Sequence, residues 1–286
     1  MKSASGNRTV RVLQQCMFAV FFLLASQSSF AAGKTSGLIH LPIEGRPQIP
    51  TAINWSTELL NAANAALAAK NPSAAAVPNG TVWVGTNFSR HHVIPQQYLQ
   101  ALVGLSQAAD SDIADTDANK LALQGALRKI RYPSAAPLLT GMVWAPVNLF
   151  EGPVGFLRSD EPGNDFELNK PRSFDEKRWN ALRNVVDVMT VLEFSNQGTE
   201  FTVSAQTLNA KGGLAKLTAA VVELAKYTQE NPVPIHRFAN TDWVDGRSLS
   251  AINLQDLVGF SSSLIVTDSL VASKKNAYRL KLKTER

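Results

Sequence analysis

Apolar residues repeat at helical spacing in several separate stretches of the chain. The alanine-rich segment from Thr51 to Lys70 places Leu60, Ala63 and Leu67 on one stripe. It is followed by Asn71-Pro72, and proline cannot continue a helix because it lacks an N–H group and clashes with the preceding turn. The pattern therefore predicts a helix over residues 51–70.

Four later segments show the same periodicity, with leucine or another apolar residue returning every three or four positions. The third of them has a further start signal, since Ser173 and Glu176 have the spacing of a capping box. The first predicted helix begins near Gln96, with Tyr98, Leu102 and Leu105 on one face, and the second runs from Asp117 to Ile130. The third runs from Phe174 to Glu193. The fourth contains Leu214, Leu217, Val221 and Leu224 and ends at Asn231-Pro232.

Short runs of β-branched and aromatic residues between these helices predict strands. Residues 32–50, with Pro42, Pro47 and Pro50, predict an extended lead-in. We find no internal repeat, and the pattern as a whole predicts an α+β fold that is predominantly helical. The expected strands are Thr81–Val84 after the turn at Asn79-Gly80, a return strand at His91–Ile94, Thr199–Val203 and Ser263–Val266.

The first 31 residues have the pattern of a cleaved signal peptide. A basic start leads into the apolar run Cys16–Ala25, and small residues before Ala32 favour cleavage after Ala31. The apolar run of about 10 residues is half of what a membrane helix needs, so we expect no membrane span. We predict export, to the periplasm or as a secreted protein. Removal of Cys16 with the signal would leave a cysteine-free mature chain, which excludes disulfides and thiolate metal sites.

The remaining chain of roughly 255 residues is long enough for a substantial core. We predict a single globular domain over residues 51–286, with two packed lobes as the alternative. The formal charge of +5 falls to +2 without the basic residues Lys2, Arg8 and Arg11. Six of the remaining 25 basic residues lie in a basic C-terminal tail, residues 274–286, beside a single acidic residue. We interpret this tail as a solvated end or a protected edge strand. Bulk charge therefore does not predict nucleic-acid binding.

Two polar stretches are predicted to be loops. Acidic residues alternate from Asp110 to Asp117 as in a calcium loop, but the glycine and the distal glutamate of that pattern are missing. We interpret this stretch as a polar loop and helix cap. The second stretch, from Asn148 to Asp165, is punctuated by glycine and proline and is the kind of loop that carries functional residues.

Two of the four histidines are adjacent, in the segment Ser89-Arg90-His91-His92-Val93-Ile94-Pro95. Neighbouring side chains of a strand point to opposite faces, so the two rings can bind one ion together only if the chain turns there. They can instead divide roles, one ring binding metal while the other transfers protons. A structural alternative remains open, in which both rings bond to backbone carbonyls at the end of a strand. We assign His236, in an extended proline-rich segment, an ordinary surface role.

The segment His91-His92-Val93-Ile94-Pro95 resembles the opening of the HNH (ββα-metal) endonuclease superfamily, in its His-His-x-x-Pro branch. The resemblance covers residues 81–165 and implies a ββα-metal-like element that carries the histidine pair. It implies that His91 binds a divalent metal ion (Mg, Mn or Zn), that His92 is the general base that activates water, and that Asn148 positions the loop bearing the base. An imidazole can accept a proton near neutral pH, and a cation stabilises charge on a phosphodiester.

The chain departs from the family pattern at the next metal ligand. That ligand, commonly histidine, is expected near position 157, which is Leu157 here. Asp160 or Asp165 is the predicted substitute, because carboxylates are hard oxygen ligands. We also predict that Arg90, beside the histidines, contacts phosphate.

Two functions remain open from the sequence. One is an exported, metal-dependent, nuclease-like phosphodiesterase with nucleic acid as its substrate. The other is a non-enzymatic exported or envelope-associated binding protein, whose protein partner the sequence does not identify. The chain lacks Gly-x-Ser-x-Gly, so no serine-hydrolase triad is predicted, and it also lacks the glycine-rich loops of common nucleotide-cofactor folds.

Overall fold

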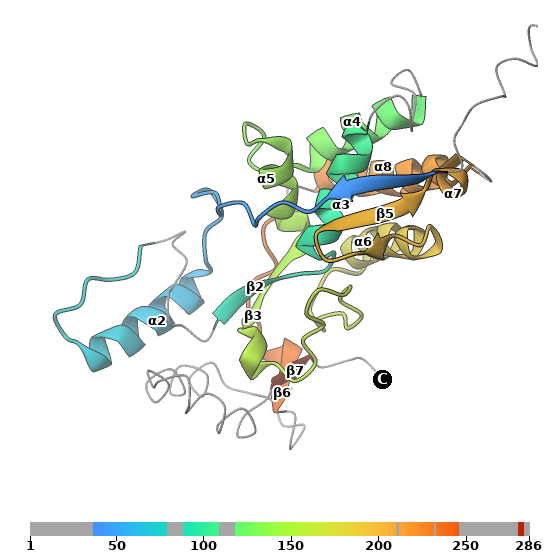
Figure 1. Cartoon of the computed structure of the whole chain (residues 1–286). Helices are drawn as coiled ribbons and strands as arrows, with labels where there is room; N and C mark the ends of the chain where they lie inside the picture. The colour runs from blue at the N-terminus through green and yellow to red at the C-terminus, as the bar shows by residue number, and fades with distance from the viewer. Residues whose placement is uncertain are drawn as a thin grey trace, which may run out of the picture.

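The computed structural model describes residues 37–78, 88–108, 118–209, 212–231, 233–245 and 280–282. Within them helices and short antiparallel strands form an α+β fold, as the sequence predicted (Figure 1). None of the helices in these ranges is long and apolar enough to cross a membrane. The predicted signal peptide, the Thr81–Val84 strand, the Asp110–Asp117 loop, the Ser263–Val266 strand and most of the basic tail lie outside the described residues.

Each predicted helix is present, with ends shifted by at most two residues except at the start of α2. The α-helices are α2 (Thr57–Lys70), α3 (Gln96–Gln107), α4 (Ala118–Ile130), α5 (Leu138–Val143), α6 (Glu176–Val191), α7 (Ala205–Asn209) and α8 (Gly213–Glu230). The described residues also contain three short 3-10 helices, η1 (Pro146–Asn148), η2 (Gly155–Leu157) and η4 (Asn240–Asp242).

The helix caps differ from those expected. Helix α2 begins six residues later than predicted, because Ser56 caps it by accepting a hydrogen bond from the Leu59 amide. Helix α6 is capped by Asp175, whose carboxylate accepts from the Arg178 amide at 2.7 Å. The predicted capping box at Ser173 is therefore wrong: Ser173 lies outside the helix, where its hydroxyl and amide bond to Asp242.

The strands form three small antiparallel sheets. The first has the order β1-β5-β4, from β1 (Leu38–Pro42), β5 (Glu200–Ser204) and β4 (Ser195–Asn196). The second pairs β2 (Phe88–His92) with β3 (Leu149–Pro153), and the third pairs β6 (Trp243–Asp245) with β7 (Leu280–Leu282). The predicted lead-in thus contains a paired strand, β1, and part of the predicted basic tail is β7.

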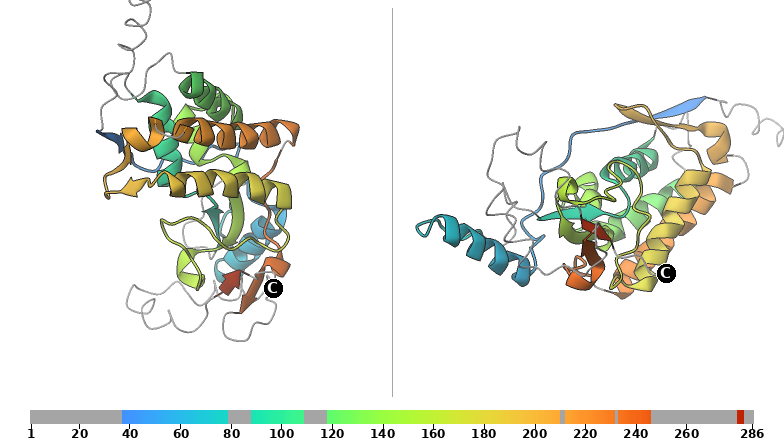
Figure 2. Two further views of the ribbon diagram at one scale, coloured as in Figure 1. Left: turned by 90° about the vertical axis from the view of Figure 1, so that its right-hand side faces the viewer. Right: turned by 90° about the horizontal axis from the view of Figure 1, so that it is seen from below.

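The main core lies among α3, α4, α6 and α8 and the inner face of the first sheet. Helix α8 packs on both α4 and α6, and Figure 2 shows α6 and α8 running side by side. Leu123 and Leu127 of α4 and Leu217 and Val221 of α8 are at most 1% exposed. Figure 1 shows that α2 instead extends away from this body, attached to it near its N-terminus, where Leu59 is buried.

The β2–β3 pair lies between the helical body and the small β6–β7 sheet, and it carries the histidines (Figure 1). Every residue of β3 is buried, which corrects the prediction that this stretch is a surface loop. No α-helix directly follows β3. The three-residue helix η2 and a long loop lead to α6 instead, so a ββα element is absent from these described residues.

Candidate functional site

The histidine pair ends strand β2, and its two rings lie in different surroundings. The ring of His91 is stacked on Phe150, with centroids 5.2 Å apart, and lies 6.2 Å from the ring of Trp243. The ring of His92 lies 5.7 Å from that of Trp144. This is the alternation expected of a strand, so the two side chains have separate partners.

Gly152 of β3 lets the aromatic layer close over His91. A Cβ atom at this position would overlap the ring of Trp243 and come within 3.0 Å of Cδ2 of His91. No L side chain fits without movement of one of these rings. The glycine that suggested a loop in the sequence is therefore explained by close packing inside a strand.

His92 is fixed by one backbone hydrogen bond. Its Nε2 lies 2.9 Å from the carbonyl oxygen of Val143. A carbonyl only accepts hydrogen bonds, so Nε2 carries the proton and, in the neutral ring, Nδ1 is the acceptor. Burial, followed by the positive charge of Arg46, lowers the pKa of His92 to about 3. The ring is therefore neutral at physiological pH.

Asn148 holds the chain immediately after the histidines. Its Oδ1 accepts from the Ile94 amide and its Nδ2 donates to the Ile94 carbonyl, both at 2.8 Å. Its backbone carbonyl accepts a third bond from the amide of Val93 at 3.0 Å. Asn148 is only 2% exposed, and both the oxygen and the nitrogen of its side-chain amide are hydrogen-bonded to the backbone of Ile94. This geometry can fix the end of β2 and thus the position of His92.

Arg178 of α6 in turn holds the segment that carries Asn148. Its buried guanidinium donates to the carbonyls of Val147 at 2.7 Å, Leu149 at 2.9 Å and Pro234 at 3.2 Å, and to that of Pro146. Burial lowers its pKa to about 10, so it remains a cation at neutral pH. A single side chain thus grips the backbone on both sides of Asn148.

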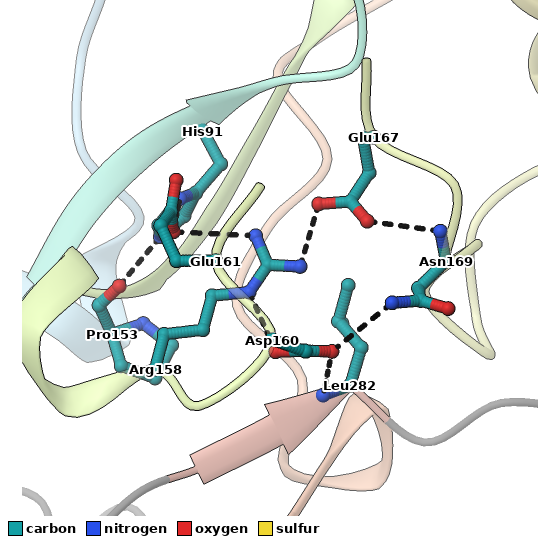
Figure 3. A network of polar contacts seen from close by, with 8 residues as sticks. All are labelled: His91, Pro153, Arg158, Asp160, Glu161, Glu167, Asn169 and Leu282. Atoms are coloured by element: carbon teal, nitrogen blue, oxygen red, sulfur yellow. Dashed lines mark hydrogen bonds and ion pairs between the residues drawn. The ribbon is translucent and has the colours of Figure 1, made fainter. Parts of the chain in front are cut away.

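His91 belongs to a polar network that Figure 3 draws. Its Nε2 lies 2.5 Å from the carbonyl oxygen of Pro153, and its Nδ1 lies 3.1 Å from Oε2 of Glu161. The first contact requires a proton on Nε2. Burial alone would raise the pKa of Glu161, but its bond to His91 and the charge of Arg158 outweigh burial and lower it.

Arg158 is the centre of the same network. Its side chain is fully buried and pairs with Glu167 at 2.5 Å, Asp160 at 3.0 Å and Glu161 at 3.5 Å. Burial alone would lower the pKa of Arg158, but the three carboxylates outweigh burial and raise it. Asp160 also accepts from the backbone amide of Leu282, which ties the network to β7 (Figure 3).

The two predicted substitute ligands lie in different places. Asp160 is in the network but is bonded to Arg158 rather than to His91. Asp165 is exposed, and within the described ranges its side chain makes no hydrogen bond or ion pair with either histidine. Among the described residues no group of three or more His, Cys, Asp or Glu side chains is arranged to hold a metal ion. The carboxylate that reaches His91 is that of Glu161.

Arg90 is only 6% exposed, which does not favour its predicted contact with phosphate. Its guanidinium lies 3.6 Å from the centroid of the Trp55 ring and donates to the carbonyl of Ile53 at 3.1 Å. Arg46 is the exposed arginine near His92, since it lies over the ring of Trp144 at 4.5 Å from the centroid. Arg46 is therefore the better placed of the two for an anionic ligand.

His236 lies beside Ser173 and Asp242, but the three do not form a hydrolase triad. The same atom, Nε2 of His236, lies 2.9 Å from Asp242 and 3.4 Å from the Ser173 hydroxyl, and that hydroxyl itself bonds to Asp242. A triad needs the imidazole between the serine and the acid, with one nitrogen for each. The arrangement instead joins the start of α6 to η4.

Glu161, Arg46 and Arg178 were missed as site residues from the sequence. Glu161 lies next to the predicted ligand Asp160, so the acidic composition of that segment was the available signal, while the identity of the contacting acid depends on how the loop folds back. Arg46 and Arg178 are far from the histidines in sequence and carried no local signal.

Comparison with known proteins assigns no family. No protein-family model matches the chain, and searches of curated proteins and of solved structures also find no match.

Proposed function

We propose that this protein is an exported phosphodiester hydrolase of the nuclease type, in which His92 accepts the proton of the attacking water. The observation that carries the proposal is the bond from Nε2 of His92 to the carbonyl of Val143. It leaves Nδ1 as an acceptor on a ring that is neutral at physiological pH. A general base requires an unprotonated acceptor atom of this kind, and the two bonds from Asn148 to Ile94 hold the adjoining backbone in place.

The proton transfer defines the step assigned to His92. As water attacks phosphorus, its proton passes to Nδ1 of His92, a P–O ester bond breaks, and the leaving oxygen takes a proton from solvent. A pKa of about 3 makes His92 a weak base. We therefore expect its contribution to be near the lower end of the roughly 10²- to 10⁴-fold range of general-base catalysis.

A divalent cation fits the pair formed by His91 and Glu161. With the ring neutral, Nδ1 of His91 and Oε2 of Glu161 both present lone pairs and lie 3.1 Å apart, while Oε2 also lies 3.5 Å from the Arg158 guanidinium. Neighbouring ligands of an octahedral magnesium ion, each at about 2.1 Å, are separated by about 3.0 Å. Magnesium is commonly held by one or two protein groups together with water and substrate phosphate. When bound, the ion would neutralise charge that develops on the phosphodiester.

Arg46 supports substrate binding in this proposal. It is exposed, lies over Trp144 beside His92, and its charge acts on His92. An arginine beside the base can bind a phosphate oxygen through paired N–H donors. Nucleic acid is thus the proposed substrate, bound by a local cation rather than by bulk charge.

The test is cleavage of single-stranded and double-stranded DNA and RNA by the exported chain, with magnesium, manganese or zinc added in turn. We expect His92→Ala to reduce cleavage about 100-fold or more. Glu161→Gln should weaken the response to added metal. His40→Ala is the matched control, because His40 is exposed and pairs only with Glu200 among the described residues.

Thermal unfolding of each variant, followed by circular dichroism, separates loss of the base from loss of the fold. If a folded His92→Ala protein cleaves nucleic acid as fast as the wild type, the assignment of the base is wrong. If no substrate is cleaved by the wild type under any of these conditions, the hydrolase proposal is abandoned and the binding-protein alternative takes its place.

A further inference from the structure

A cavity lies at the C-terminal end of α4, bounded by η1, α8 and two extended segments of the chain. Its volume is about 600 Å³, within the range of roughly 300–1,000 Å³ typical of small-molecule sites. The lining residues are Ala52, Ile53, Asn54, Lys129, Ile130, Arg131, Tyr132, Pro146, Val147, Thr228, Val233, Pro234, Ile235 and Arg237.

The charged residues that line this cavity are all basic. They are Lys129, Arg131 and Arg237, and no carboxylate is among the described lining residues. Arg237 is held in place by bonds from NH1 to the carbonyl of Asn54 at 2.8 Å and to buried Glu151 at 3.1 Å. Two of these three cations therefore have no acidic partner within the part of the chain that the structure describes.

Two buried arginines behind the wall add to the positive potential. Arg178 donates to the carbonyls of Pro146, Val147 and Pro234, and Arg90 donates to the carbonyl of Ile53. All four of these carbonyl-bearing residues line the cavity. Neither guanidinium forms an ion pair among the described residues, but the charge of buried Glu151 acts on Arg90 and that of Asp175 acts on Arg178, so each cation is partly compensated. Because charges interact more strongly away from water, these cations favour an anion in the cavity.

Arg131 is the lining arginine that is least constrained. Its NH1 donates to the carbonyl of Ala136 at 3.2 Å, and its Nε is buried with no hydrogen-bond partner in the described structure. A buried donor without a partner is costly. Rotation of this side chain toward an anionic ligand would break one weak bond and satisfy the unpaired donor.

The rest of the wall is apolar and includes one aromatic ring. Its accessible apolar surface comes from Tyr132, which is 42% exposed, and from exposed Ala52 and Pro234, whereas Ile53, Ile130, Val147 and Ile235 are at most 4% exposed. A ligand that carried only charge would leave this surface uncovered. A flat group attached to a phosphate would cover the apolar surface and could stack on the tyrosine.

We propose that this cavity binds a phosphate monoester that carries a flat, largely apolar group, the chemical class of a nucleoside monophosphate. The phosphate would contact Lys129, Arg131 and Arg237, and the nucleobase would stack on Tyr132 and cover Ala52 and Pro234. The site is separate from His92 and goes beyond the proposed hydrolase activity, because it requires binding and no cleavage.

Isothermal titration calorimetry of the exported chain tests this, with AMP and UMP, with adenosine, and with inorganic phosphate. Chelator is present throughout, so that the His91–Glu161 pair cannot contribute through a metal. We expect AMP or UMP to bind at least tenfold more tightly than adenosine or phosphate. Lys129→Gln should weaken nucleotide binding roughly tenfold, the usual effect of losing one charge-assisted contact.

Two variants control the measurement. Arg128→Gln removes an exposed charge from the neighbouring position of α4, which does not line the cavity, and His92→Ala removes the proposed base. Both should bind nucleotide as the wild type does. Equal affinity for AMP and phosphate would overturn the assignment of the apolar wall. Equal weakening by Arg128→Gln and Lys129→Gln would show a general charge effect and overturn the site.

Discussion

The buried neutral state of His92 predicts a measurable dependence of stability on pH. In the folded protein its pKa is lowered from 6.5 to about 3, by burial first and by Arg46 second. The unfolded chain therefore binds a proton at a pH where the folded protein does not. The contribution to stability is complete above pH 6.5 and is lost as pH falls from there toward 3.

The magnitude follows from the two pKa values. At pH 5 about 1.5 pKa units of the shift are expressed, each worth about 1.4 kcal/mol, so His92 lowers the free energy of unfolding by about 2 kcal/mol relative to pH 7. Carboxylates titrate mainly at lower pH, but they also contribute. The informative quantity is therefore the difference between wild type and His92→Gln, in which the titration of this side chain is absent.

Urea unfolding followed by tryptophan fluorescence measures this at pH 7 and pH 5. We expect the wild type to lose about 2 kcal/mol more than His92→Gln over this interval. His40→Gln is the control for substituting a histidine at an exposed site, because it leaves the His92 side chain and its surroundings unchanged. Equal losses in the wild type and His92→Gln would refute the lowered pKa of His92 and the desolvation that causes it.

Two further predictions concern the groups that hold the site. Asn148→Ala leaves the amide and carbonyl of buried Ile94 unpaired, so it should lower the free energy of unfolding by about 2–5 kcal/mol in urea unfolding. The control, Asn184→Ala on the exposed face of α6, should change the free energy of unfolding by less than about 0.5 kcal/mol. Arg178→Met removes donors to four carbonyls and should lower the free energy of unfolding by about 3 kcal/mol or more in the same assay. The control, Arg183→Met, loses only a pair with exposed Asp187 and should cost about 0.5 kcal/mol. Similar losses in each variant and its control would contradict the stabilising roles of Asn148 and Arg178.

Local sequence determined most of the helices and located the histidine pair. Helices α3, α4, α6 and α8 could be predicted because each buries one apolar stripe. The spacing of such a stripe can be read within a single segment of the sequence. The adjacent histidines were also visible, and their separate surroundings follow from the alternation of a strand. The positioning role of Asn148, predicted from a resemblance, stays a prediction, and what the structure shows is its pair of bonds to Ile94.

Only the tertiary structure decided which groups meet around these residues. Strand β3 was predicted to be a loop because it contains Glu151, Gly152 and Pro153, yet it is buried, since distant groups satisfy Glu151 and the Trp243 ring requires the glycine. Glu161 replaces the expected aspartates at His91 because the chain reverses after η2. Such contacts join residues far apart in sequence, so the local pattern carries no record of them. The cavity beside α4 arises in the same way, from lining residues on five separate segments, two of which carry its charges.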